Sequence, residues 1–197
     1  MATRTTDLEA GLDRRPGKRV RLIESARDIL FRQGVEPTTL MEIAEAADVP
    51  PGNVYYYFKT KDELVEAVIE SHVAAVKGLL ESLERHRTPR ARLKAFVGML
   101  ADQAETTARF GCPQGTLCSE LDKREGRLRG AAAELLRLPV DWAERQFREL
   151  GRRDARDLAF ALVASYQGTA LVTNAYRDPG LAIREARRLG RWIDSLA

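Results

Sequence analysis

The chain has 197 residues, of which 31% are charged and 44% hydrophobic, and its formal net charge at pH 7 is +3. This charge is too small for a protein that binds nucleic acid over its whole surface. The sequence contains no apolar run near the roughly 20 residues of a membrane-spanning helix, and its N-terminal residues lack the apolar segment of a signal peptide. We therefore expect a soluble, cytoplasmic protein with one full domain and a small second one.

Residues 1–17 combine Gly, Pro and mixed charge with little apolar content, which predicts a disordered basic arm. The first helix is expected over residues 18–33 and should end at Gly34. Residues 14–32 contain seven basic and two acidic side chains, a local charge of +5. Such a stripe suits contact with DNA phosphates, and a solvated helix face is the alternative.

Residues 38–61, with the sequence TTLMEIAEAADVPPGNVYYYFKTK, predict two short helices around a turn. The first should begin near Leu40 with a capping box, because Thr39 can accept from the Glu42 amide while the Glu42 carboxylate reaches back to the Thr39 amide. Pro50 and Pro51 interrupt the helical pattern, and Pro51 can begin the second helix because proline is accepted at the first helical position.

The second short helix contains three consecutive tyrosines, Tyr55, Tyr56 and Tyr57. Neighbouring residues on a helix are about 100° apart, so the three rings cannot all face one core and at least one must point outward. Aromatic residues at helical spacing are more often core residues, and we expect Phe58 and part of Tyr55 to pack inside. An outward tyrosine near two lysines indicates a DNA-reading helix-turn-helix.

This stretch resembles the DNA-binding domain of the TetR family of bacterial transcriptional regulators. The resemblance covers about residues 18–66 and rests on the following positions: Thr38-Thr39, Ile43-Ala44, Ala47, Val49, residues 52–58 and Lys61-Asp62-Glu63-Leu64. It implies DNA-backbone contacts by Thr38, Thr39, Tyr56, Tyr57 and Lys61. It implies contacts at or near the bases by Gly52, Asn53 and Tyr55. Pro50 and Pro51 depart from the serine and polar residue usual there, which argues against a phosphate contact from position 51.

The rest of the chain is predicted to be helical. A long helix should run from about Thr60 to Arg87 and another from Pro89 to about Thr107. Residues 109–121, RFGCPQGTLCSEL, interrupt the pattern and restart as a helix near Thr116; a similar GCPxGxLxxEL stretch occurs in one branch of TetR-type C-terminal domains. Further helices are expected over about residues 125–150, with a kink at Pro139, and over residues 154–176 and 179–196.

The predicted fold is therefore all-α, with about nine helices. A basic arm (1–17) precedes a three-helix helix-turn-helix domain (18–64), which is joined to a helical effector-binding and dimerisation domain (65–197). In the TetR family such arms sometimes enter the minor groove, which implies a role for Arg14 and Arg15. The last two helices carry more apolar residues than one side of a monomer needs, which predicts a four-helix dimer interface. Its candidates are Leu162, Tyr166, Leu189, Trp192 and Ile193. A monomer whose last helices complete the core is the alternative.

Two kinds of sensor are compatible with the sequence. Cys112 and Cys118 are the only cysteines, and in a cytosolic chain they indicate free thiols, inert or redox-active, rather than a structural disulfide. His72 and His86 lie about 21 Å apart along one helix and cannot share a metal ion, so we expect no metal and no cofactor. The family resemblance implies an effector pocket in the body. Candidate lining residues are His72, Phe96, Met99, Gln103, Phe110, Cys118, Trp142, Tyr166, Gln167 and Asn174.

The function that fits these features best is a homodimeric repressor that a small molecule releases from a palindromic operator on double-stranded DNA. An activator, a ligand-independent architectural DNA binder and a thiol-based redox sensor using Cys112 or Cys118 are the alternatives. An enzyme is not expected, because the sequence contains no nucleophile motif, phosphate-binding loop or paired-carboxylate context.

Overall fold

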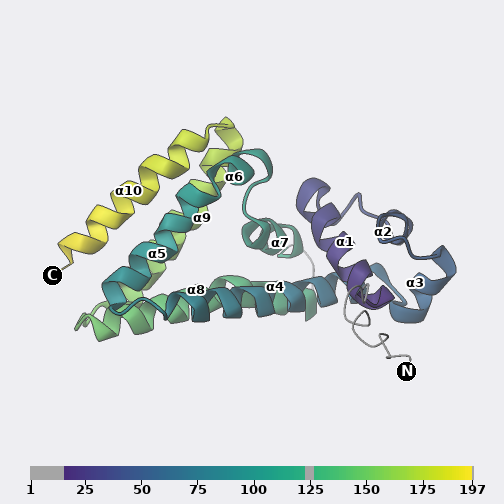
Figure 1. Ribbon diagram of the computed structural model, residues 1–197, viewed down its shortest axis with the longest axis horizontal. Coiled ribbons are helices and arrows are strands. Elements are labelled where there is room, and N and C mark those ends of the chain that lie inside the picture. Colours follow the sequence, from purple (N-terminus) through teal and green to yellow (C-terminus); the bar gives the residue numbers. More distant parts are fainter. Residues whose placement is uncertain (1–15, 123–126, 197) are drawn as a thin grey trace, which may run out of the picture.

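The computed structural model describes residues 16–122 and 127–196, and within these ranges it contains ten α-helices and no strand (Figure 1). The all-α prediction is confirmed. One helix more than expected is present, because the predicted helix from Pro89 is divided at Gln103 into α5 (Pro89–Asp102) and α6 (Ala104–Phe110). The predicted arm, including Arg14 and Arg15, lies outside the described residues except for its last two positions.

Three short helices and the start of a fourth form a small N-terminal group, which we call the head: α1 (Lys18–Gln33), α2 (Leu40–Ala46), α3 (Pro51–Tyr57) and the first turns of α4 (Lys61–Leu83). Apolar residues at helical spacing face inward from all four helices. The buried side chains of this core include Leu22, Ala26, Leu30, Ile43, Ala44, Val54, Phe58, Leu64 and Val68.

Local chemistry fixes the ends of the short head helices. The predicted capping box is present, since the Thr39 hydroxyl accepts from the Glu42 amide at 3.2 Å and the Glu42 carboxylate accepts from the Thr39 amide at 2.8 Å. The hydrogen bond from the Thr39 amide lowers the pKa of Glu42. Between α2 and α3 the chain turns at Asp48, whose φ of 51° lies in the left-handed region. α3 then begins at Pro51, as predicted.

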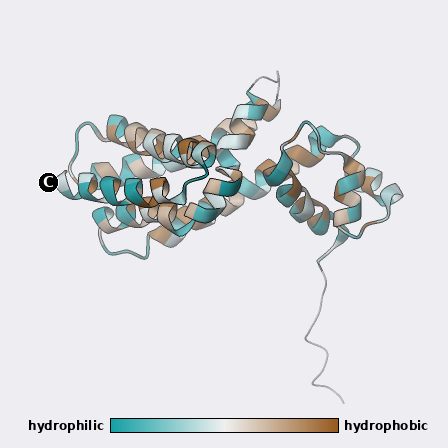
Figure 2. Ribbon diagram, turned by 90° about the horizontal axis from the view of Figure 1, so that it is seen from above, coloured by the Kyte–Doolittle hydropathy of each residue, from teal (hydrophilic) through white to brown (hydrophobic). Residues whose placement is uncertain are grey.

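The remaining helices form the body, and α4 connects it to the head (Figure 1). In the body, α4 packs along α8 (Arg127–Glu149), which continues through Pro139 as one helix. α9 (Ala155–Tyr176) packs on α8, and α10 (Pro179–Ser195) packs on α5 and α9. α7 (Pro113–Leu121) lies between the body and α1. In Figure 2 the head and the body form two groups of helices, with hydrophobic and hydrophilic residues alternating along each ribbon.

The body has its own hydrophobic core, with Trp142 and Phe147 among its largest fully buried side chains. A polar group satisfies the Trp142 indole, whose Nε1 donates to the Glu84 carboxylate at 2.7 Å. The same carboxylate accepts from Gln146 at 3.1 Å and pairs with Arg92 at 3.0 Å. Within the described residues, no helix combines the length and apolar composition that crossing a membrane requires.

Candidate nucleic-acid interface and body cavities

The outward face of α3 is aromatic. Tyr56 is 77% exposed and Tyr55 is 50% exposed, whereas Val54 and Phe58 on either side are buried in the head core. Tyr57 is half-buried against that core, and its ring meets the Tyr56 ring edge-on with centroids 5.0 Å apart. The prediction that at least one of the three rings points outward is confirmed. Tyr57 therefore supports the exposed Tyr56 ring from the core side.

The first turn of α3 carries the small and polar residues of the predicted interface. Gly52 is exposed and Asn53 is half-buried. The Asn53 backbone amide donates to the Pro50 carbonyl at 2.8 Å, so this amide is occupied within the turn. Gly52 and the Asn53 side chain remain beside Tyr55 and Tyr56. α3 lies at the end of the molecule remote from the C-terminus (Figure 1).

Two of the residues that the resemblance assigned to DNA contact are used inside the head. The Thr38 side chain is 1% exposed, and its hydroxyl donates to the Gly34 carbonyl at 2.6 Å. The Lys61 ammonium donates to the carbonyls of Val35, Glu36 and Thr38 at 3.0–3.1 Å. An ammonium group has three N–H donors, so these three carbonyls satisfy it. In this arrangement Thr38 and Lys61 shape the loop before α2, and Thr39 remains exposed beside it.

Three arginines of the basic stripe predicted over residues 14–32 have partners within the chain. The Arg19 guanidinium lies over the Phe58 ring at 5.3 Å, and Arg21 pairs with Asp48 at 3.5 Å. Arg27 donates to the Ser71 hydroxyl at 3.4 Å and so faces α4. These three arginines contact other parts of the chain, which local charge counting cannot detect.

The candidate effector residues do not form one site. Four of them, Phe96, Met99, Tyr166 and Gln167, line a cavity between α4, α5, α8 and α9. The Phe96 and Tyr166 rings are 5.1 Å apart, and burial raises the pKa of Tyr166. This cavity has a volume of about 50 Å³. Typical small-molecule sites have roughly 300–1,000 Å³, so the cavity would have to widen for such a ligand.

The other candidates lie elsewhere. Trp142 is 1% exposed and bonded to Glu84, whereas Gln103 is exposed at the end of α5. His72 is buried, and its pKa is lowered to about 4 by burial and by the nearby Arg27 charge. Cys118 and Asn174 line a groove of about 410 Å³ together with Gln167.

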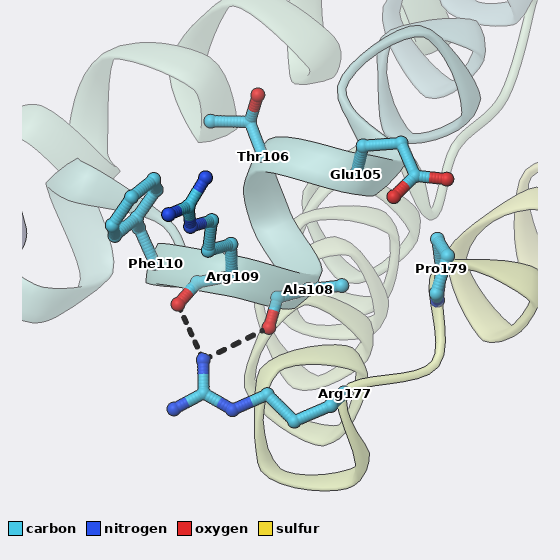
Figure 3. Close-up of a pocket in the computed structure, with 7 residues that line it drawn as sticks. All are labelled: Glu105, Thr106, Ala108, Arg109, Phe110, Arg177 and Pro179. Atoms are coloured by element: carbon cyan, nitrogen blue, oxygen red, sulfur yellow. Dashed lines mark hydrogen bonds between the residues drawn. The ribbon is translucent and has the colours of Figure 1, made fainter.

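Phe110 lines a different hollow, of about 560 Å³, between α6 and the turn from α9 to α10 (Figure 3). Arg177 closes one side of this hollow, since its guanidinium donates to the backbone carbonyls of Ala108 and Arg109. Arg177 also ends α9 in the left-handed conformation, with a φ of 54°. Arg177 therefore fixes the α9–α10 turn against α6, through partners 68 and 69 residues away in sequence.

Both cysteines are free thiols in environments that disfavour the thiolate. Burial raises the pKa of Cys112. Burial and the neighbouring Cys112 raise the pKa of Cys118 to about 11, and its Sγ donates to the Ala132 carbonyl at 2.9 Å. The thiolate is the reactive form of cysteine, so these environments argue against a fast thiol switch.

The predicted dimer residues are largely enclosed within the protomer. Leu162, Leu189 and Ile193 are at most 1% exposed and belong to the body core, because α9 packs on α8 and the apolar stripe of α10 packs on α5. Tyr166 and Trp192 are half-buried against the same core. The exposed apolar surface lies on another face of α9, at positions spaced mostly by three and four. Its large members are Phe160, Leu171, Val172 and Tyr176, and its small ones are Ala161, Ala164, Gly168 and Ala175.

The leucines and the glutamate of the motif GCPxGxLxxEL had no role predicted from the sequence. Leu117 and Leu121 are buried in the head core, so α7 packs against the head. The Glu120 carboxylate accepts a hydrogen bond from the Val35 amide at 2.6 Å. The spacing of the leucines could have predicted a buried helix face. It could not predict the partner of Glu120, because that partner lies 85 residues away in sequence.

Comparison with known proteins is consistent with this geometry. Residues 22–68 match the family described as bacterial regulatory proteins, tetR family. The chain is similar to an uncharacterized HTH-type transcriptional regulator in the lacX 3′ region of Lactococcus lactis subsp. lactis, with 28% identity over 80% of this chain and 84% of the relative. It is also similar to the HTH-type transcriptional regulator TtgR of Pseudomonas putida, with 43% identity over 27% of this chain and 25% of that protein.

Solved structures share the fold along most of the chain. The regulatory protein TetR from Rhodobacter sphaeroides superposes with a TM-score of 0.77 and 27% identity, over 87% of this chain and 96% of that one. A TetR transcriptional regulator from Legionella pneumophila gives a TM-score of 0.81 at 16% identity, over 93% and 98% of the two chains. The likeness therefore includes the body as well as the head.

Proposed function

The chain belongs to the TetR family of bacterial transcriptional regulators, which are DNA-binding proteins and not enzymes, and we propose that it is a homodimeric repressor released from a palindromic operator by a small molecule. The observation that carries the DNA-reading role is the exposed Tyr55–Tyr56 surface between the buried Val54 and Phe58. A folded head has no need of two exposed rings on one short helix, whereas a helix entering the major groove does need side chains that reach bases and phosphates.

We assign the contacts by position on this surface. Gly52 and Asn53 lie in the first turn of α3 and Tyr55 lies one turn later, and these three would read base edges. Thr39, Tyr56 and Tyr57 would contact the DNA backbone. Thr38 and Lys61 contribute indirectly, since their hydrogen bonds hold the loop between α1 and α2 that positions the reading helix.

The proposed dimer uses the exposed apolar face of α9. This face combines large side chains, such as Phe160 and Leu171, with alanines and a glycine that permit close helix approach. Two copies related by a two-fold axis would bring α9 against its counterpart and place the two heads on the same side of the assembly. Two α3 helices about one DNA turn apart would then read a palindrome.

Release by a small molecule is favoured over ligand-independent binding because the body has a groove of about 410 Å³, within the usual size range of ligand sites. The raised thiol pKa values argue against the redox alternative. A repressor and an activator would share all of these features and differ in where the operator lies relative to the promoter. Either would act in the cytoplasm, where bacterial DNA is located.

The test is an electrophoretic mobility assay with DNA that flanks the gene, in the presence of excess random-sequence DNA. We expect a retarded complex on a fragment with an inverted repeat, and loss of the complex when one half of the repeat is scrambled. A reporter assay on the same fragment then separates repression from activation. Absence of binding to any inverted repeat, including those selected from random DNA, would contradict the proposal.

A further inference from the structure

The groove of about 410 Å³ lies between α7, α8 and α9, next to the junction of the body with the head. Its apolar walls include Leu136 on α8 and Leu171 on α9. It is separate from the small central cavity, although Gln167 borders both. A ligand with an apolar body of modest size therefore fits this groove without the widening that the central cavity would need.

The polar groups of this groove favour a positively charged ligand. Glu120 is the one carboxylate in its lining, and none of the described residues that line it is Lys, Arg or His. Asn174 uses its amide nitrogen to donate to the Ala108 carbonyl at 3.2 Å, which leaves its side-chain oxygen as an acceptor. The Gln167 oxygen comes so close to Gly115 that an added Cβ would lie 2.7 Å from it. The groove lining thus carries one negative charge and two side-chain amide oxygens beside its hydroxyl groups, which suits the N–H donors of an amine.

The same carboxylate holds the head. Glu120 accepts from the Val35 amide at 2.6 Å, at the end of α1 where the chain leaves for α2. It also lies against Gly34, where an added Cβ would come within 2.8 Å of Glu120 Oε1. Gly34 has a φ of 86°, so its backbone conformation favours glycine, and a side chain there would displace the Glu120 carboxylate. One side chain of the body is therefore both a wall of the groove and an anchor for the loop before α2.

We propose that this groove binds a small organic cation, an amine with an apolar body, whose ammonium group pairs with Glu120 and competes with the Val35 amide for that carboxylate. The inference rests on the proposed function, because it names the class of molecule that releases the operator. Binding of the amine would weaken the anchor of the head, and a ligand shifts such an equilibrium by its differential affinity for the two states. Operator DNA must then lower the affinity for the amine by the same factor by which the amine lowers operator affinity.

The face of α9 proposed for the dimer adjoins the opening of the groove. Leu171 is 71% exposed and belongs both to the rim of the groove and to the apolar face of α9. A second copy on this face would cover part of the opening, so access of the amine and the arrangement of the dimer would be linked.

The test compares three probes with the same phenylbutyl body and different charge: phenylbutylamine, phenylbutanol and phenylbutyrate. Calorimetric titration into the full chain without DNA should give an affinity for the amine at least about tenfold above those for the alcohol and the acid, a factor worth roughly 1.4 kcal/mol. Glu120→Gln keeps an oxygen that can accept from the Val35 amide but removes the charge. It should lower amine affinity at least about tenfold and leave alcohol affinity unchanged.

Two further variants separate a local charge effect from a general one. Glu105→Gln removes a carboxylate from the hollow between α6 and the α9–α10 turn, and should leave binding of all three probes unchanged. Ser119→Trp changes an exposed residue on the groove lining and should block all three probes with the fold intact by circular dichroism. The inference is overturned if the amine binds no better than the alcohol and the acid, if Glu120→Gln leaves amine affinity unchanged, or if Ser119→Trp leaves it unchanged.

Operator binding provides the readout that separates this inference from the proposed function. Operator DNA is selected from random sequences with the unliganded chain, and the amine is then added. If operator binds and the amine neither binds nor releases it, only the inference fails. If no operator is found, the proposed function fails, and the calorimetric comparison still decides whether the groove is an amine site.

Discussion

The Lys61 ammonium and the Thr38 carbonyl are joined by a hydrogen bond of 3.1 Å between the first turn of α4 and the residue before the α2 cap. Two more bonds from the same ammonium, to the Val35 and Glu36 carbonyls, complete its three donors. The sequence resemblance implied that Lys61 contacts a phosphate, but its three N–H donors are bonded to backbone carbonyls. Lys61 therefore positions the loop that orients the helix-turn-helix.

Lys61→Ala should lower the stability of the chain by about 1–3 kcal/mol, because three backbone carbonyls lose a charged donor. It should also weaken operator binding by disturbing the loop. The dependence of log K on log salt should keep its slope, because no phosphate contact is removed. Chemical denaturation and binding titrations at several salt concentrations measure both effects.

Lys59→Ala is the matched control. The Lys59 ammonium is exposed at the end of α3 and donates to one carbonyl, that of Tyr55 at 2.7 Å, so two of its donors can reach a phosphate. This variant should flatten the salt dependence by about one unit with little change in stability. If Lys61→Ala flattened the slope of log K against log salt and Lys59→Ala left it unaltered, Lys61 and not Lys59 would be the lysine that contacts phosphate.

Tyr56→Phe tests the exposed ring of α3. The hydroxyl is the only group removed and the ring is 77% exposed, so the unfolding temperature should change by less than about 2 °C. Operator affinity should fall about fivefold to tenfold if the hydroxyl donates to a phosphate. Tyr176→Phe is the control, because Tyr176 is 76% exposed on α9 of the body and the substitution keeps its ring on the face proposed for the dimer. Equal effects of the two substitutions on operator affinity would remove Tyr56 from the interface.

Phe160→Arg tests the proposed dimer. The Phe160 ring is 67% exposed on the apolar face of α9, and a charge there would be buried without a partner in a two-fold interface. Light scattering should show monomers at concentrations where the unmodified chain is dimeric, with a dissociation constant raised at least about a hundredfold, or roughly 2.7 kcal/mol.

Val20→Arg, at a 46% exposed position on α1, should leave the dimer intact. Trp192→Arg is a poor test, because Trp192 packs on Phe147 with ring centroids 6.0 Å apart and its loss would damage the protomer core. A dimer that survives Phe160→Arg would place the interface away from this face of α9.

The buried His72 predicts a specific acid sensitivity. Its pKa is about 4 in the folded chain, from burial and then the Arg27 charge, against an ordinary value of 6.5. Between these two values the unfolded chain binds more protons than the folded one, so stability falls as the pH is lowered from about 6.5 to 4. The slope from this group approaches about 1.4 kcal/mol per pH unit.

Carboxylates also bind protons at the lower end of this pH range and change the stability of the chain. The contribution of His72 is therefore measured by comparing the unmodified chain with a variant. The glutamine of His72→Gln binds no proton in this pH range. Denaturant unfolding should therefore show that the variant loses less stability than the unmodified chain between pH 6.5 and 4.5. Parallel curves for the two proteins would mean that His72 does not lose its proton on folding. His86→Gln serves as the control, since His86 is half-exposed at the end of α4.

Local sequence was sufficient to predict the helices and the outward orientation of at least one tyrosine of α3. A capping box, a proline at a first helical position and a 100° step between neighbours depend on residues close together in the chain, so α2 and α3 begin where predicted. The same rules failed at Gln103, where one expected helix is divided into two. Nothing in the spacing of apolar residues distinguishes a bent connection from a continuous helix.

Tertiary structure decided what each exposed or buried side chain contacts. Apolar residues of α9 and α10 were visible in the sequence, but only packing on α5 turns Leu189 and Ile193 inward and leaves Phe160 outside. Lys61 and Glu120 find their partners 23 and 85 residues away. By itself the sequence determined the helical class and the reading helix, because those depend on short-range periodicity and capping. The roles of these two charged residues, the groove and the face open to a second copy depend on contacts between distant segments, and only the folded chain brings those segments together.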